Sequence, residues 1–118
     1  MYTYNKRAFI VQNTPLSPEK LARLTQQFEH CKAQLLQLSW ITQGSVFETQ
    51  DHTWRWTRKV KAKTVTVALS AQQAQLFQQA IAQHRELETL LDKMRAISQK
   101  ILLGSVPGPP RRKRTKPS

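Results

Sequence analysis

The sequence predicts an α+β fold: a long helix, a three-stranded antiparallel meander and a second long helix, with the helices pairing as an antiparallel hairpin. Apolar residues recur at alternating steps of three and four within residues 17–41, and a similar pattern returns within 70–103. That spacing places them on one face of an α-helix. Between these segments, within residues 45–69, apolar and polar side chains alternate, and a period of two indicates strands.

The first helix is expected to begin at Ser17-Pro18-Glu19, where a hydroxyl N-cap precedes a proline and an acidic residue. It should end near Ile41, before Gly44. Its apolar face comprises Leu21, Leu24, Phe28, Cys31, Leu35 and Leu38.

The second helix is expected to begin with a capping box, in which Ser70 and Gln73 satisfy each other's free amide groups. It should end at Leu103, because Gly104 and the prolines that follow stop a helix. Its apolar face comprises Phe77, Ile81, His84, Leu87, Leu91, Met94, Ile97 and Ile101, with Leu90 beside it.

The second and third strands are expected to form a hairpin. A tight turn at Ala62-Lys63 would pair Val60 with Val65 and Trp56 with Leu69 on one apolar face. Such turns usually contain glycine or asparagine, so a left-handed Ala62 would cost about 1 kcal/mol. A four-residue loop, residues 61–64, keeps the same pairing without that strain.

An earlier strand, residues 45–50, is expected to join the hairpin through a turn at Asp51-His52. Phe47 would then meet Trp56 on the apolar face, and Glu48 would meet Arg55 on the polar face. The predicted core of the sheet is Phe47, Trp56, Val60, Val65, Val67 and Leu69. We therefore interpret the tryptophans of this segment as core, the alternative being that they stack on exposed bases.

The length of 118 residues suits a single domain. We expect an N-terminal arm (1–16), one helix–sheet–helix domain (17–103) and a disordered basic tail (104–118). Phe9-Ile10-Val11 would be a strand or a docking segment of the arm. The single Cys31 suits a reducing cytoplasm, and no apolar run approaches the length of a membrane-spanning helix.

The formal charge of +12 is concentrated in two segments, residues 53–63 and 111–116, that contain no acidic residue. Clustered positive charge favours a polyanion, usually a nucleic acid, over a basic surface without a dedicated ligand. The candidate nucleic-acid-binding residues are Arg55, Arg58, Lys59, Lys61, Lys63, Arg111, Arg112, Lys113, Arg114 and Lys116.

No constellation of catalytic or metal-binding residues is apparent. His30 and Cys31 are neighbours on a helix and point in different directions, so they would not share a metal. His84 lies on the apolar face of the second helix, which is typical of a partly buried histidine. No glycine-rich phosphate loop is present. We therefore expect no enzymatic activity, no catalytic residue, no metal and no cofactor.

Three segments resemble a family of small bacterial proteins of unknown function that are often associated with transposases in mobile elements. These segments are "QGSVFE" (43–48), "WRWTRKVKAKTVTVALS" (54–70) and "QLFQQAIAQHRELETLL" (75–91). The family pattern has a Gly-Ser start, an aromatic strand, a Lys-x-x-Lys turn, a strand ending at Leu-Ser and a long helix. Members often have glycine where this chain has Ala62. The resemblance implies the fold and a mobile-element setting, and it carries over no catalytic residue.

The expected function is therefore that of a non-enzymatic DNA-binding accessory protein of a mobile element. The basic face of the sheet and the basic tail would contact DNA. The alternatives are a helical protein–protein interaction or dimerisation module, with coiled-coil character, and an RNA-binding protein. Expected partners are DNA in preference to RNA, a transposase or other mobile-element protein, and a second copy of the chain, with no membrane. The expected localisation is cytoplasmic, with the nucleoid.

Overall fold

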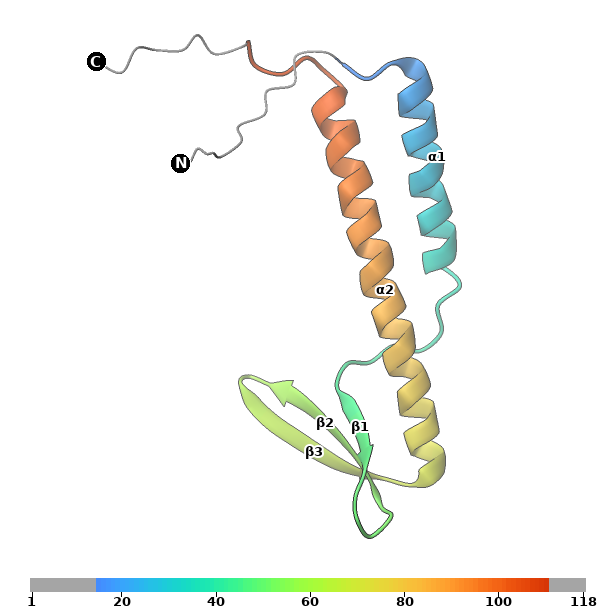
Figure 1. Cartoon of the computed structure of the whole chain (residues 1–118), viewed down its shortest axis with the longest axis vertical. Helices are drawn as coiled ribbons and strands as arrows, with labels where there is room; N and C mark the ends of the chain where they lie inside the picture. The colour runs from blue at the N-terminus through green and yellow to red at the C-terminus, as the bar shows by residue number, and fades with distance from the viewer. Residues whose placement is uncertain (1–14, 111–118) are drawn as a thin grey trace, which may run out of the picture. The chain divides into compact units, whose positions relative to one another are not determined.

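The computed structural model describes residues 15–110 and confirms the predicted order of elements (Figure 1). Helix α1 is followed by three strands, which form one antiparallel sheet in the order β1-β2-β3, and then by helix α2. The elements are α1 (Pro18–Leu35), β1 (Ser45–Glu48), β2 (Trp54–Val60), β3 (Lys63–Leu69) and α2 (Ala71–Gly104). The predicted strand or docking segment at Phe9-Ile10-Val11 lies outside the described residues, as do residues 111–118 of the tail.

Both helix starts follow the predicted capping. The hydroxyl of Ser17 accepts a hydrogen bond from the amide of Lys20 at 3.2 Å. At the start of α2, the amide of Gln73 donates to Ser70 Oγ at 3.1 Å, and the amide of Ser70 donates to Gln73 Oε1 at 2.9 Å. This reciprocal pair is the predicted capping box.

The predicted end of the first helix near Ile41 is wrong, because α1 ends at Leu35. The segment that follows bonds to α2 instead of continuing the helix. The amide of Ser39 donates to Gln83 Oε1 at 2.9 Å, and the amide of Thr42 donates to the carbonyl of Ala80 at 3.3 Å. These tertiary hydrogen bonds compete with the intrahelical bonds that local spacing alone would favour.

The chain divides into two compact units, which are described separately: a helical unit (Met1–His30 with Lys93–Ser118) and a sheet unit (Cys31–Asp92). In the helical unit, α1 begins beside the end of α2, and the amide of Leu16 donates to the carbonyl of Gly104 at 2.8 Å. The two helices therefore run antiparallel in this unit, as predicted (Figure 1). Partly buried apolar side chains of the unit include Leu24, Phe28, Met94, Ile97 and Ile101.

The sheet unit has a small core around the first two thirds of α2. Its most buried apolar residues are Cys31, Ala74, Ile81 and Leu90. Trp56 of β2 packs on Phe77 of α2, with ring centroids 4.7 Å apart at 49°. Its indole N–H donates to the carbonyl of Gln43 at 2.9 Å. Trp56 is thus part of the packing between sheet and helix, as the alternation predicts.

The predicted register of β1 is wrong by one residue. Phe47 pairs with Arg55 and Val46 pairs with Trp56, whereas the sequence predicts Phe47 opposite Trp56. The cause is the turn, which contains three residues: the amide of Thr49 bonds to the carbonyl of Thr53, and His52 has a φ of 63°. One extra residue in the turn moves every side chain of the strand to the opposite face of the sheet.

This exchange moves Phe47 out of the predicted core, and its side chain is 46% exposed. Val46 takes its place beside Trp56 and is partly buried. Two other predicted core residues, Val60 and Val67, are also exposed, at 39% and 38%. Val67 is the partner of Trp56 on β3, and Val60 lies beside the β2–β3 turn, so the helix covers Trp56 but leaves part of this face of the sheet open.

The register between β2 and β3 differs from the predicted one by two residues. Trp56 pairs with Val67 and Val60 with Lys63, so the turn residues are Lys61 and Ala62. A shift of two keeps every side chain on its predicted face. Both turn residues have positive φ, 49° for Lys61 and 69° for Ala62, which is the type I′ arrangement without glycine or asparagine.

Replacement of Ala62 by glycine is expected to raise the free energy of unfolding by about 0.5–1 kcal/mol, because glycine adopts a positive φ without steric cost. Chemical denaturation followed by circular dichroism measures the change. Ala68→Gly is the matched control, since Ala68 lies within β3, and there glycine should lower stability by about 0.5–1 kcal/mol. Destabilisation by both variants would contradict the left-handed turn.

Candidate nucleic-acid interface

One face of the sheet carries hydroxyl groups and basic side chains. The register places Lys59 opposite Thr64 and Thr57 between Ser45 and Thr66. Arg55 lies on the same face, two residues before Thr57. These residues form what we call the polar face: Ser45, Arg55, Thr57, Lys59, Thr64 and Thr66.

A depression of about 390 Å³ lies on this face, lined partly by Ser45, Thr57, Lys59 and Thr64. The lining thus includes three residues that carry a hydroxyl group and one lysine. Such donors suit the oxygen atoms of a phosphate group, which accept several hydrogen bonds at once.

The basic side chains near the β2–β3 turn are exposed. Lys59 is on the polar face, and Lys61 is in the turn. Within residues 15–110, neither forms an ion pair with an acidic side chain. Arg55 is partly buried, and its Nη1 donates to the carbonyl of Trp54 at 3.2 Å. The polar face therefore carries positive charge that the described acidic residues leave largely unpaired.

Two of the sequence-predicted site residues lie on the opposite face of the sheet. Lys63 pairs with Val60, and it is exposed at the end of β3. Arg58 lies over the ring of Trp56, with Cζ 4.2 Å from the ring centroid. Its Nη1 is buried without a hydrogen-bond partner among the described residues. Arg58 therefore stabilises the packing of Trp56 by a cation–π contact, and it also contributes to the lining of the hollow that Lys59 and Thr57 line.

The remaining predicted site residues, Arg111, Arg112, Lys113, Arg114 and Lys116, lie outside the described residues. Their contribution to binding stays a prediction.

Acidic groups lie at the other end of β2, beside the β1–β2 turn. The hydroxyls of Thr49 and Thr53 donate to Asp51 and hold its pKa below the ordinary value. Asp51 therefore remains ionised at neutral pH. Glu48 approaches His52, with Oε2 3.3 Å from Nδ1, and does not pair with Arg55 as predicted. The positive charge of the sheet is thus concentrated toward Lys59 and Lys61.

A second concave surface in the sheet unit is apolar and was not anticipated from the sequence. A groove of about 630 Å³ is lined by residues that include Trp40, Ile41, Leu76 and Phe77. Trp40 is 86% exposed and Leu76 is 64% exposed. The groove forms because the segment after α1 lies along α2. The sequence instead predicts a helix that continues to about Ile41, so the groove could not be predicted from it.

Among residues 15–110, no group of three or more histidine, cysteine, aspartate or glutamate side chains is placed to hold a metal ion. The side chain of His84 is 18% exposed, and its Nε2 lies 3.5 Å from Glu88 Oε2 and 3.3 Å from Gln43 Nε2. His84 is therefore partly buried, as predicted. In the same range, no helix has the length and apolarity that a membrane span requires.

Comparison with known proteins finds no matching family model, no similar curated protein and no similar solved structure.

Proposed function

We propose that this chain is a non-enzymatic DNA-binding protein that contacts duplex DNA through the polar face of its sheet. The observation that supports this most directly is that the exposed Lys59 lines one hollow together with three hydroxyl-bearing residues, Ser45, Thr57 and Thr64. The opposite face of β2 is engaged in packing through Trp56 and Phe77. The polar face is therefore the one available for a ligand.

The contacts follow from the chemistry of each side chain. Lys59 and Lys61 provide mobile ammonium groups that neutralise phosphates and release counterions. The threonine hydroxyls donate hydrogen bonds to phosphate oxygens. A β-ribbon fits a major groove about 12 Å wide, where the guanidinium of Arg55 would reach the acceptor atoms of guanine.

The mobile-element setting of this proposal, with a transposase as a partner, rests on the sequence resemblance alone. The basic tail would add sequence-independent affinity, since its cations would neutralise further phosphates.

The test is a DNA titration of the triple variant Arg55→Gln, Lys59→Gln and Lys61→Gln. Because Lys59 and Lys61 are the two side chains assigned to phosphates, the slope of log affinity against log salt becomes shallower by about 2. The affinity at low salt falls accordingly. Fluorescence anisotropy with a labelled duplex measures both quantities, and circular dichroism checks that the variant remains folded.

The matched control removes three charges from the helical unit by Lys20→Gln, Arg23→Gln and Lys100→Gln. It changes the net charge equally, so long-range electrostatic attraction falls by a similar amount. The control slope should change by less than about 1. Equal slopes for the two triple variants would contradict the assignment of DNA binding to the polar face.

The groove beside Trp40 supports a second candidate function, that of a protein–protein interaction module. An exposed tryptophan next to Leu76 resembles the aromatic anchors of protein interfaces. The DNA titration separates the two functions. A chain that acts only through protein interfaces would bind DNA weakly, with no difference between the two triple variants.

A further inference from the structure

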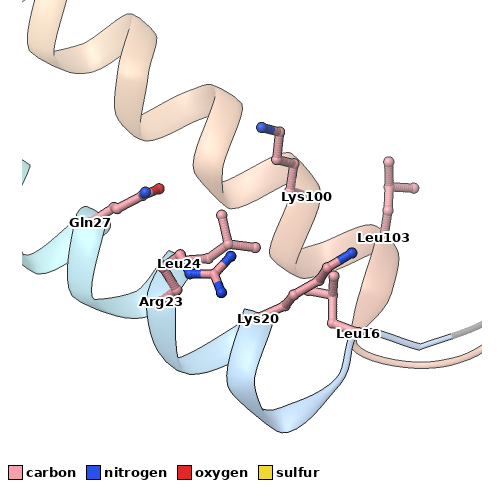
Figure 2. A pocket seen from close by; sticks show the side chains of 7 residues that line it. All are labelled: Leu16, Lys20, Arg23, Leu24, Gln27, Lys100 and Leu103. Carbon is pink, nitrogen blue, oxygen red and sulfur yellow. The ribbon is translucent and has the colours of Figure 1, made fainter.

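The helical unit contains an open depression where α1 begins and α2 ends (Figure 2). It encloses about 380 Å³ and combines apolar and cationic side chains. Its apolar part consists of Leu16, Leu24 and Leu103, and its cations are Lys20, Arg23 and Lys100. Both helices contribute to each kind, so the depression depends on their pairing within this unit.

The positive charge of this depression is uncompensated. Within residues 15–110, no acidic side chain lines it and none of the three cations forms an ion pair. Glu19, one turn before Arg23 in α1, forms no ion pair with it either. The positive end of the α1 dipole and the negative end of the α2 dipole meet at this depression and oppose each other, so its positive charge comes from the three cations. The depression therefore favours an anionic ligand.

The apolar part is held in place by a close contact. Leu16 donates its amide proton to the carbonyl of Gly104, and its side chain lies where a Cβ at position 104 would collide, 2.9 Å from Leu16 Cδ1. Leu24 points from α1 toward α2 in Figure 2. Leu103, on the other wall, is 62% exposed. A ligand with an apolar group would displace water from these leucines, which is favourable.

We propose that this depression binds an acidic amphipathic helix of a partner protein. A leucine or isoleucine of that helix contacts the three leucines, and carboxylates one turn to either side pair with Lys20, Arg23 and Lys100. Carboxylates at positions i and i+3 or i+4 lie on one face of a helix, which suits a lining that combines three cations with three leucines.

Charge and apolar chemistry together select this ligand. A nucleic-acid backbone supplies negative charge but no aliphatic side chain to cover the leucines. A second copy of this chain is disfavoured, because each copy has 19 basic and 7 acidic residues and a formal charge of +12. Like charges across an interface are repulsive.

The experiment uses the full-length chain and a labelled helical peptide of about 16 residues, roughly 24 Å long, with leucines on one face flanked by glutamates. The triple variant Lys20→Gln, Arg23→Gln and Lys100→Gln should weaken peptide binding about tenfold. The charge-matched variant of Arg55, Lys59 and Lys61 should change it less than about twofold. Leu103→Asn should weaken it about threefold, because the apolar contact is reduced.

Methyl NMR spectra identify the binding site, since the peptide should shift the resonances of Leu16, Leu24 and Leu103. A control peptide with glutamine in place of glutamate should lose most of the affinity. Equal weakening by the two triple variants would overturn the proposal, because only general electrostatic attraction would remain. So would leucine shifts caused by a DNA duplex and not by the peptide, since the depression would then be a nucleic-acid contact.

Discussion

Replacement of Trp56 by alanine is expected to lower the free energy of unfolding by about 3 kcal/mol, at the low end of the cost for large aromatic side chains. The ring packs on Phe77, supports the guanidinium of Arg58, and donates a hydrogen bond to Gln43. Its loss would leave Arg58 without the ring that covers its buried Nη1. Urea denaturation followed by far-ultraviolet circular dichroism measures the loss.

Trp40→Ala is the matched control, because it removes the same side chain from a position that is 86% exposed. It should change the stability by less than about 0.5 kcal/mol. Comparison of these two variants also tests whether Trp56 belongs to the core or stacks on exposed bases. A Trp56→Ala chain that keeps its stability but no longer binds single-stranded nucleic acid would show that Trp56 is a stacking surface and not part of the packing.

Replacement of Gly44 by alanine is expected to destabilise the chain by about 2–4 kcal/mol. Gly44 has a φ of 108°, which side-chain-bearing residues rarely adopt. A Cβ there would also lie 2.6 Å from the indole nitrogen of Trp56 and would collide with the carbonyl oxygen of Thr57. Relief of either clash would move the start of β1 or weaken the hydrogen bond from Trp56 to Gln43.

Gly108→Ala serves as the control for Gly44→Ala, because Gly108 has no positive φ. It should leave the denaturation midpoint almost unchanged, within about 0.5 kcal/mol. If the two alanine variants were equally stable, position 44 would not require the positive φ and the close contacts that only glycine allows there.

Local chemistry along the chain predicts both helix starts and the two faces of the β2–β3 hairpin. The capping groups at Ser17 and Ser70 identify both helix starts, because their hydrogen bonds join residues only three apart. The alternation in β2 and β3 identifies the two faces of that hairpin. The observed register of this hairpin differs from the predicted one by two residues. Lys59 and Trp56 nevertheless lie on their predicted faces, because a shift by an even number of residues leaves each side chain on the same face of the sheet.

Other features depend on contacts between residues that are distant in sequence, and these emerge from the folded chain alone. Val46 and Phe47 are adjacent apolar residues, so alternation did not reveal which of them faces Trp56, and the three-residue turn settled it. The end of α1 and the groove at Trp40 depend on hydrogen bonds from residues 39–42 to α2. Likewise, the cationic depression brings Arg23 and Lys100 together from the two paired helices. Local periodicity does not encode such placements, because they arise from the packing and hydrogen bonding of segments separated by many residues.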